Sequence, residues 1–255
     1  MTWLLLHDAP APGAWNMALD EALLEAADTG GLRSLRLYAW DPPAISFGRH
    51  EPALRRYDRA AMAARGLDVV RRPTGGRAVW HHRELTYSVA APTDTFGSLP
   101  DTYREIHAML AEAALALGAS VALAGPCAAV SVGAGACFAS PAGGEVVTTT
   151  GAKLVGSAQV RRGRAFLQHG SLLLAAEQDV IAGLTRGEVA APDAAGLADL
   201  IGDRATWQAA ALAVSLAARR RWETPEAPGA LPARLRERAE AWRARYADDG
   251  WTWRR

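Results

Sequence analysis

The sequence contains one lysine, Lys153, although lysine and arginine together account for 28 of its 255 residues. Arginine carries a planar guanidinium that stays charged, whereas the lysine amine is compact, can shift its pKa and can approach an oxyanion or phosphate end-on. Lys153 lies within residues 151–159, a small, glycine-flanked segment where a ligand could reach the backbone. The alternative is a lysine retained by chance on a surface turn. The glycine-rich surroundings favour a functional lysine.

Cysteine is also scarce. The two cysteines, Cys127 and Cys137, are too few for a disulfide framework. No apolar run approaches the roughly 20 residues that a transmembrane helix needs. Residues 1–8 lack the basic and apolar regions of a signal peptide. We therefore expect a reduced, cytoplasmic protein that does not act at a membrane.

Net charge is low, at +1, so no overall attraction to nucleic acid or membrane is expected. Basic residues gather locally at residues 161–164, 219–221 and 234–245, and these clusters could attract an acidic partner protein. The alternative is that they are solvated helix faces and strand ends, which we favour for the last cluster.

Hydrophobic periodicity and turn residues predict strands in the middle of the chain and helices toward its ends. This order is typical of an α+β fold rather than of regular βαβ winding. The predicted helices cover residues 16–27, 53–65, 103–117, 205–221 and 232–246. The predicted strands cover residues 34–40, 44–47, 67–72, 84–91, 145–150, 154–161 and 165–174. Asn16 is the expected cap of the first helix, with Asp20 and Glu21 near its start.

Residues 71–82 form the first segment that could carry chemistry. Two arginines end a strand, Gly75 and Gly76 make a turn, and two histidines follow. Paired glycines let the backbone approach a ligand and point its N–H groups at an anion or carbonyl. His81 and His82 should point to opposite faces of a strand, so at most one of them faces a site. Adjacent histidines chelate a metal poorly and no third ligand is suitably spaced, so we expect no metal site.

The irregular segment 125–144 contains both cysteines, and loops of that length inside a compact domain are usually functional or disordered. A lone cysteine is most often a small buried hydrophobe. A nucleophilic cysteine needs exposure and a nearby cation that lowers its pKa. Lys153 is close to Cys137 in the sequence, and a strand at 145–150 with its return could bring the two together.

Residues 165–174 read as a buried strand interrupted by His169, Gly170 and Ser171. A buried histidine satisfied by a backbone carbonyl is one interpretation. Glycine within a strand instead suggests the close approach of another group, which favours a binding role.

Together these segments resemble the lipoate–biotin protein ligase superfamily, and most closely its LipM-type octanoyltransferase branch and the related lipoate-protein ligase A family. The resemblance covers residues 13–185. It rests on five motifs that occur in order, at residues 16–22, 43–48, 71–79 with 84–88, 151–159 and 167–171. Five ordered motifs are far more specific than any one of them. Where the family often has Asp, this chain has His82.

The resemblance implies a single catalytic domain over residues 1–255. Its central, largely antiparallel mixed sheet is flanked by helices, with helices in 205–248 packed on the same body. It implies that Cys137 takes the acyl group and that Lys153 lies at the acyl carbonyl, while Cys127 is structural. The expected substrate-binding residues are Arg72, Gly75, Gly76, Arg77, His81, Gly156, Ser157, Ala158, His169 and Gly170.

The implied activity is transfer of an octanoyl or lipoyl group from acyl carrier protein to a lysine of a lipoyl-domain protein. The acceptor would be a protein such as the glycine cleavage H protein or a 2-oxoacid dehydrogenase E2. No cofactor is required, because the thioester already stores the activation.

Three alternatives remain open. One is an ATP-dependent lipoate-protein ligase that acts through lipoyl-AMP with ATP and Mg²⁺. Another is an amidotransferase that moves acyl groups between acceptor proteins. The third is a non-catalytic paralogue that binds acyl-proteins.

Overall fold

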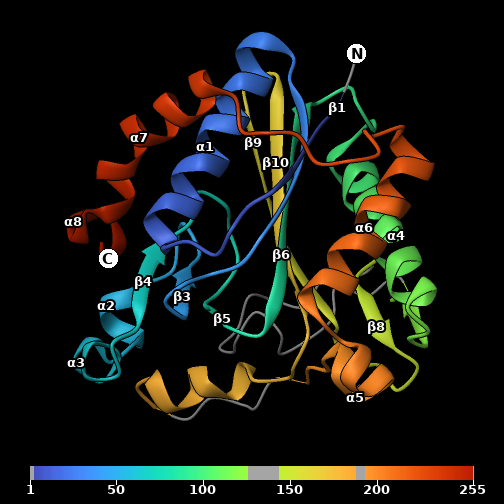
Figure 1. The fold of residues 1–255 in the computed structure, drawn as a ribbon. Coiled ribbons are helices and arrows are strands. Elements are labelled where there is room, and N and C mark those ends of the chain that lie inside the picture. The colour runs from blue at the N-terminus through green and yellow to red at the C-terminus, as the bar shows by residue number, and fades with distance from the viewer. Residues whose placement is uncertain (1–2, 126–143, 188–192, 255) are drawn as a thin grey trace.

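The computed structural model describes residues 3–125, 144–187 and 193–254 and shows an α+β protein (Figure 1). Its larger sheet has five strands in the order β1-β2-β6-β10-β9. The bounds of these strands are β1 Trp3–His7, β2 Arg33–Tyr38, β6 Glu84–Pro92, β10 Ala165–Leu173 and β9 Val155–Arg162. Only β1 and β2 pair in parallel within this sheet, so it is largely antiparallel, as predicted.

A smaller sheet of three strands lies beside the first, in the order β4-β3-β5. Its strands are β3 Ala44–Phe47, β4 Asp68–Arg71 and β5 Val79–His81. The turn with Gly75 and Gly76 connects β4 to β5, so it belongs to the smaller sheet. A third pairing joins β7 (Val121–Leu123) to β8 (Val146–Thr148).

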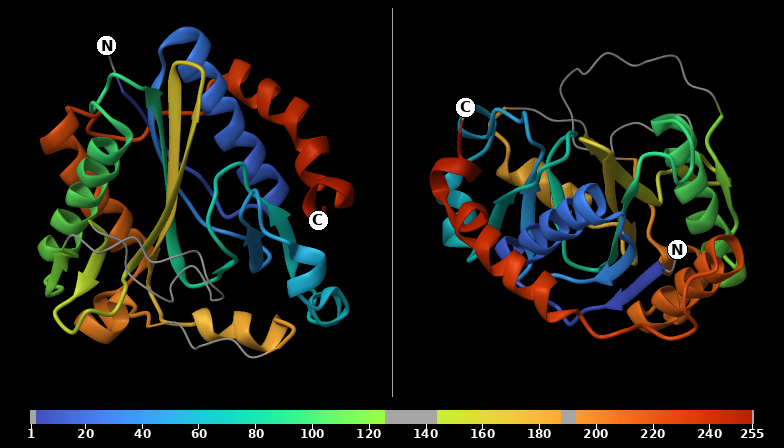
Figure 2. Two further views of the ribbon diagram at one scale, coloured as in Figure 1. Left: turned by 180° about the vertical axis from the view of Figure 1, so that it is seen from behind. Right: turned by 90° about the horizontal axis from the view of Figure 1, so that it is seen from above.

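Helices cover both faces of the larger sheet (Figures 1 and 2). Helix α1 (Gly13–Gly30) packs on β6 and β10, and α7 (Ala233–Ala247) packs outside α1. On the other face, α4 (Leu99–Ala116) packs against α6 (Trp207–Trp222). Successive residues of a strand point to opposite faces. Accordingly Tyr87 and Val89 join the core under α4 and α6, while Ala90 joins the core under α1.

The first helix differs from its prediction. It begins at Gly13, so Asn16, Asp20 and Glu21 lie inside it and are buried. Asn16 does not cap the helix, because its amide instead donates to the carbonyls of Ala11 and Ala39. The carboxylates of Asp20 and Glu21 therefore bind side chains of other elements and do not interact with the start of the helix.

The helix predicted over residues 53–65 was wrong, because two short helices occupy that range. They are α2 (Ala53–Arg56) and α3 (Arg59–Ala64). Tyr57 is extended between them, and Asp58 accepts a hydrogen bond from the backbone N–H of Ala61 as the cap of α3. Capping by Asp is a local signal that the run of helix-forming residues obscured.

Several short elements had no sequence prediction, namely β1, β7, η1 (Gln178–Leu184), α5 (Leu197–Ile201), η2 (Gly202–Arg204) and α8 (Asp249–Thr252). The basic cluster at 219–221 lies at the end of α6, where its arginines pair with Glu226, Glu112 and Glu105. Among the helices of the described ranges, none is both long and apolar enough to cross a bilayer.

Candidate functional site

A pocket lies where the two sheets face one another. The smaller sheet and its loop supply Ser46, Arg72, Val79 and His81. The larger sheet and α1 supply Met17, Tyr38, Trp40, Thr86, Gly156, Ser157, Ala158, His169, Gly170 and Ser171. Seven of the sequence-predicted site residues line this pocket. The pocket lining does not include Gly75, Gly76, Arg77 or Lys153. The first three lie in the turn between β4 and β5, and Lys153 lies in a separate buried cluster.

Arg72 organises the glycine turn from within. Its guanidinium donates to the carbonyls of Gly75 at 2.8 Å and Arg77 at 2.6 Å, and to the carbonyl and hydroxyl of Ser46 at 2.9 and 3.0 Å. Gly76 has a φ of 84°, a conformation that a residue with a Cβ rarely adopts. Thus Gly75, Gly76 and Arg77 shape the wall that Arg72 presents to the pocket.

His81 and His82 point in opposite directions, as predicted. His81 is buried, with Nε2 2.7 Å from the Ser46 hydroxyl and Nδ1 2.7 Å from Glu84 Oε1. The indole of Trp40 stacks on the His81 ring at 4.0 Å between centroids. His82 is on the outside, 2.8 Å from Glu177. The residue that departs from the family pattern is therefore not part of the pocket lining.

Gly170 is required by the packing of two strands. It pairs with Ser157 on β9, and a Cβ at Gly170 would collide with the Gly156 carbonyl and the Ser157 hydroxyl. The close approach that glycine indicated in the sequence is thus made by the neighbouring strand. Gly156, Ser157 and Ala158 form a wall of small residues because they lie opposite this glycine and His169.

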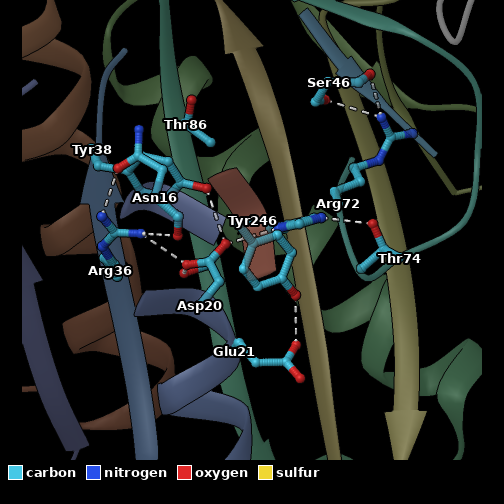
Figure 3. Close-up of polar contacts among 12 residues, drawn as sticks. Asn16, Asp20, Glu21, Arg36, Tyr38, Ser46, Arg72, Thr74, Thr86 and Tyr246 are labelled. Carbon is cyan, nitrogen blue, oxygen red and sulfur yellow. Dashed lines mark hydrogen bonds and ion pairs between the residues drawn. The ribbon is translucent and has the colours of Figure 1, made fainter. Parts of the chain in front are cut away.

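Asp20 lies in a buried polar network with Arg36 and Tyr38 (Figure 3), and His169 belongs to the same network. Its Nδ1 lies 2.9 Å from Asp20 Oδ2, and its Nε2 lies 2.7 Å from the Thr74 hydroxyl. Asp20 also accepts hydrogen bonds from Arg36 at 2.9 Å, Tyr38 at 3.0 Å and Ser88 at 2.8 Å.

The protonation states in this network follow from its partners. Burial alone would raise the pKa of Asp20, but the hydrogen bond from His169 and the charge of Arg36 outweigh it and hold the pKa below its usual value. Burial lowers the pKa of His169, and the contacts with Asp20 oppose that effect without cancelling it. The network therefore contains a carboxylate and a neutral imidazole.

Lys153 lies in a second buried cluster, beside the pocket. Its Nζ is 2.7 Å from Glu145 Oε1, which also accepts a hydrogen bond from the Tyr103 hydroxyl at 2.9 Å. The side chains of Lys153 and Glu145 are each 3 % exposed. The backbone of Lys153 bridges Val147 of β8 on one side and Ala194 on the other, so it is held from both sides.

His107 connects the lysine cluster to the pocket. Its Nε2 lies 2.8 Å from the hydroxyl of Ser157, which lines the pocket and is also 2.6 Å from the Tyr87 hydroxyl. Its ring stacks on Tyr103 at 4.2 Å. Burial, together with the charge of Lys153, lowers the pKa of His107 to about 3, so the imidazole is neutral.

Sequence reasoning missed His107, Glu145, Tyr87 and the role of Asp20. One signal was available for His107, since it lies one turn after Tyr103 and one before Leu110 and Ala111 on the buried side of the predicted helix. A polar residue on an apolar helix face indicates a buried partner. The other three residues acquire their roles from contacts between distant segments.

Cys127 and Cys137 lie outside the described residues. Hydrogen bonds join the described residues on the two sides of their segment. The N–H of Gly144 donates to the carbonyl of Ala124 at 2.9 Å, and Ala124 donates to Glu145 at 2.7 Å. The segment that carries both cysteines therefore leaves and re-enters the described structure beside Glu145, the partner of Lys153.

Within the ranges that the structure describes, no group of three or more His, Cys, Asp or Glu side chains could hold a metal ion. The pocket instead combines small and aromatic side chains with two buried imidazoles and one buried guanidinium. This arrangement suits a ligand with an apolar part and a polar group.

Comparison with protein families identifies this architecture. A model of the lipoyl protein ligase A/B catalytic domain matches residues 12–217. The chain belongs to this family. The match includes every described residue of the pocket and of the lysine cluster, and it confirms the resemblance found in the sequence.

Named relatives match over nearly the whole chain. The protein named octanoyltransferase LipM from Kyrpidia tusciae is 38 % identical, over 100 % of this chain and 99 % of its own length. The protein of the same name from Symbiobacterium thermophilum is 36 % identical, over 99 % and 98 %. Both alignments cover this chain almost from end to end, so the similarity extends beyond residue 217, where the family match ends, into the C-terminal helices.

Solved structures of lipoate-protein ligases share the fold. A lipoate-protein ligase A bound with ATP superimposes with a TM-score of 0.82 and 20 % identity, covering 99 % of both chains. A putative lipoate protein ligase from T. acidophilum with bound lipoic acid has a TM-score of 0.80 and 21 % identity, covering 99 % of this chain and all of its own. The predicted fold class is therefore confirmed.

Proposed function

We propose that this protein is an octanoyltransferase that moves an octanoyl group from acyl carrier protein to a lysine of a lipoyl-domain protein. Similarity over the full length to relatives named octanoyltransferase carries the proposal. The pocket between the two sheets supports it, because small and aromatic walls suit a saturated chain.

Cys137 is the proposed nucleophile. Its thiolate attacks the carbonyl carbon of the octanoyl thioester and forms a new C–S bond. The C–S bond to the carrier protein breaks, and the carrier leaves as a thiolate that takes up from water the proton that Cys137 had given up. The neutral amine of the acceptor lysine then attacks the acyl-enzyme. The Cys137 sulfur leaves, and the proton lost by the amine balances the thiolate that is released. Placement of both ends of the cysteine segment beside Glu145 supports this role.

Lys153 is the proposed electrostatic partner of both steps. A buried ammonium stabilises a thiolate and the oxyanion of a tetrahedral intermediate more strongly than a solvated one can. Glu145 limits the charge of the site and orients the amine. Because the thioester already carries the activation, the proposed reaction uses no nucleotide and no metal.

The proposed acceptor is a lipoyl-domain protein such as the glycine cleavage H protein or a 2-oxoacid dehydrogenase E2. One structural neighbour is described as a bi-partite lipoate protein ligase with its E2 lipoyl domain. Docking of acidic carrier and acceptor proteins should be sensitive to salt if exposed arginines such as Arg161 and Arg164 take part.

Intact-mass analysis after mixing with octanoyl carrier protein tests the proposal. The native protein and the Cys127→Ser control should each gain one octanoyl group that hydroxylamine removes. The Cys137→Ser variant should gain none and should no longer octanoylate a lipoyl domain. Full activity of Cys137→Ser that depends on ATP and free lipoate would instead identify a ligase. Carrier binding without any adduct or transfer in the native protein would identify a non-catalytic paralogue.

A further inference from the structure

The pocket has one wall from each sheet, and a buried hydrogen bond joins the two walls. Thr74 begins the glycine loop, defined here as residues 74–77, which follows β4 of the smaller sheet. His169 lies on β10 of the larger sheet. The Thr74 hydroxyl is 2.7 Å from His169 Nε2, and both residues are buried, at 0 % and 5 % exposure.

The direction of this hydrogen bond follows from Asp20. An ionised carboxylate only accepts hydrogen bonds, and Asp20 accepts from Arg36, Tyr38 and Ser88 as well as from His169. His169 must therefore carry its proton on Nδ1. In a neutral imidazole Nε2 is then an acceptor, so the Thr74 hydroxyl donates to it.

The surroundings of His169 favour this neutral form. The titratable or charged groups that face it come from three elements, namely Asp20 on α1, Arg72 at the end of β4 and His81 on β5. Arg72 and His81 disfavour a positive charge on the ring, and Asp20 is already paired with Arg36 from β2. A neutral ring with its proton toward Asp20 satisfies every partner in this network.

We propose that His169 is a positioning residue that holds the glycine loop against the larger sheet and so sets the width of the acyl pocket. Arg72 ties the loop to itself and to Ser46, all within the smaller sheet. The Thr74 carbonyl accepts from Arg49, again outside the larger sheet. The Thr74–His169 bond adds a tie across the pocket, anchored by Asp20 on α1.

The kinetic test of this inference rests on the proposed acyl transfer. Three single variants and one double variant separate an effect on the pocket from an effect on folding. Thr74→Val is isosteric but cannot donate, and His169→Asn keeps a donor for Asp20 but loses Nε2. Each should raise the KM for octanoyl carrier protein by up to about tenfold with a smaller change in kcat. Thr74→Ser keeps the hydroxyl and should have the native KM. Both substitutions remove the same hydrogen bond. The KM of the double variant should therefore be no higher than that of the single variant with the higher KM.

A direct readout does not depend on activity. The ¹⁵N NMR signals of His169 in the native protein should show the proton on Nδ1, and the same tautomer should persist in Thr74→Ser. A proton on Nε2, an unchanged KM in Thr74→Val, or multiplicative effects in the double variant would each overturn the inference. Absence of acyl transfer in the native protein would overturn the proposed function instead, and the tautomer would still test the contact.

Discussion

The ammonium of Lys153 lies 2.7 Å from the carboxylate of Glu145, and this ion pair is almost completely excluded from water. Removing one partner of a buried pair costs more than the pair contributes, because the remaining charge stays buried. The lone lysine of the sequence is thus held by a carboxylate that follows directly after the segment carrying both cysteines.

Glu145→Gln should lower the free energy of unfolding by about 3 kcal/mol, since it leaves the Lys153 ammonium buried with a neutral amide. Urea denaturation measures the change. Glu226→Gln is the matched control, because Glu226 pairs with Arg219 on the surface, where its side chain is 79 % exposed. The control should cost less than about 1 kcal/mol. An equal decrease in the free energy of unfolding in the two variants would show that the buried pair contributes no more to stability than the exposed one.

His107 should make stability fall at mildly acid pH. Its pKa is about 3 in the folded protein, below the usual 6.5, so the unfolded chain binds the proton first. The stabilisation from a neutral His107 is full above pH 6.5 and is lost as pH decreases toward the folded pKa. Between pH 6.5 and 4 this amounts to about 3 kcal/mol.

His107→Gln removes this titration, and urea denaturation across that pH range should show a shallower decline. His50→Gln is the control, because His50 is exposed in the folded protein. The control should keep the native slope. A native slope in His107→Gln would mean that other groups account for the acid sensitivity.

Arg71 should be irreplaceable by lysine. Its buried guanidinium donates to the carbonyls of Gly48, Glu51, Trp251, Thr252 and Arg254. A single ammonium cannot reach the carbonyls of Gly48 and Glu51 and those of the C-terminal residues at once. Arg71→Lys should cost about 2 to 3 kcal/mol of unfolding free energy and make the C-terminal residues more susceptible to carboxypeptidase. Arg55→Lys on the exposed side of α2 should change neither property.

Local patterns in the sequence predicted much of the sheet. Period-two alternation located β6, and a buried apolar run located β10. Adjacency alone predicted that His81 and His82 face opposite ways, and His81 is buried while His82 is exposed. Glycines marked turns, as Gly75 and Gly76 do between β4 and β5. These features depend on neighbours within a few residues, which the sequence displays directly.

The polar architecture of the site could not be predicted in the same way. Asp20 and His169 are 149 positions apart. The charge of Lys153 acts on His107 because α4 packs beside β8, the strand that the Lys153 backbone bridges. The residues next to Asp20 in the sequence indicate only an acidic residue near the start of a helix. Its buried partners come from other segments. In the predicted helix 53–65, the local cap at Asp58 acts together with a long-range contact, because the Tyr57 backbone bridges Thr185.

Gly170 and Gly75 offer a last comparison, because the sequence suggested a ligand contact for both. A Cβ at Gly170 would strike the backbone of β9, whereas a Cβ at Gly75 would meet no atom within 4 Å. Gly170→Ala should therefore force β9 and β10 apart and cost more than about 2 kcal/mol of unfolding free energy. Gly75→Ala should change stability by less than about 1 kcal/mol. Thermal unfolding of the two variants measures the difference. A tolerated alanine at 170 would mean that β9 can shift, and that the wall formed by Gly156 and Ser157 is not held by strand packing.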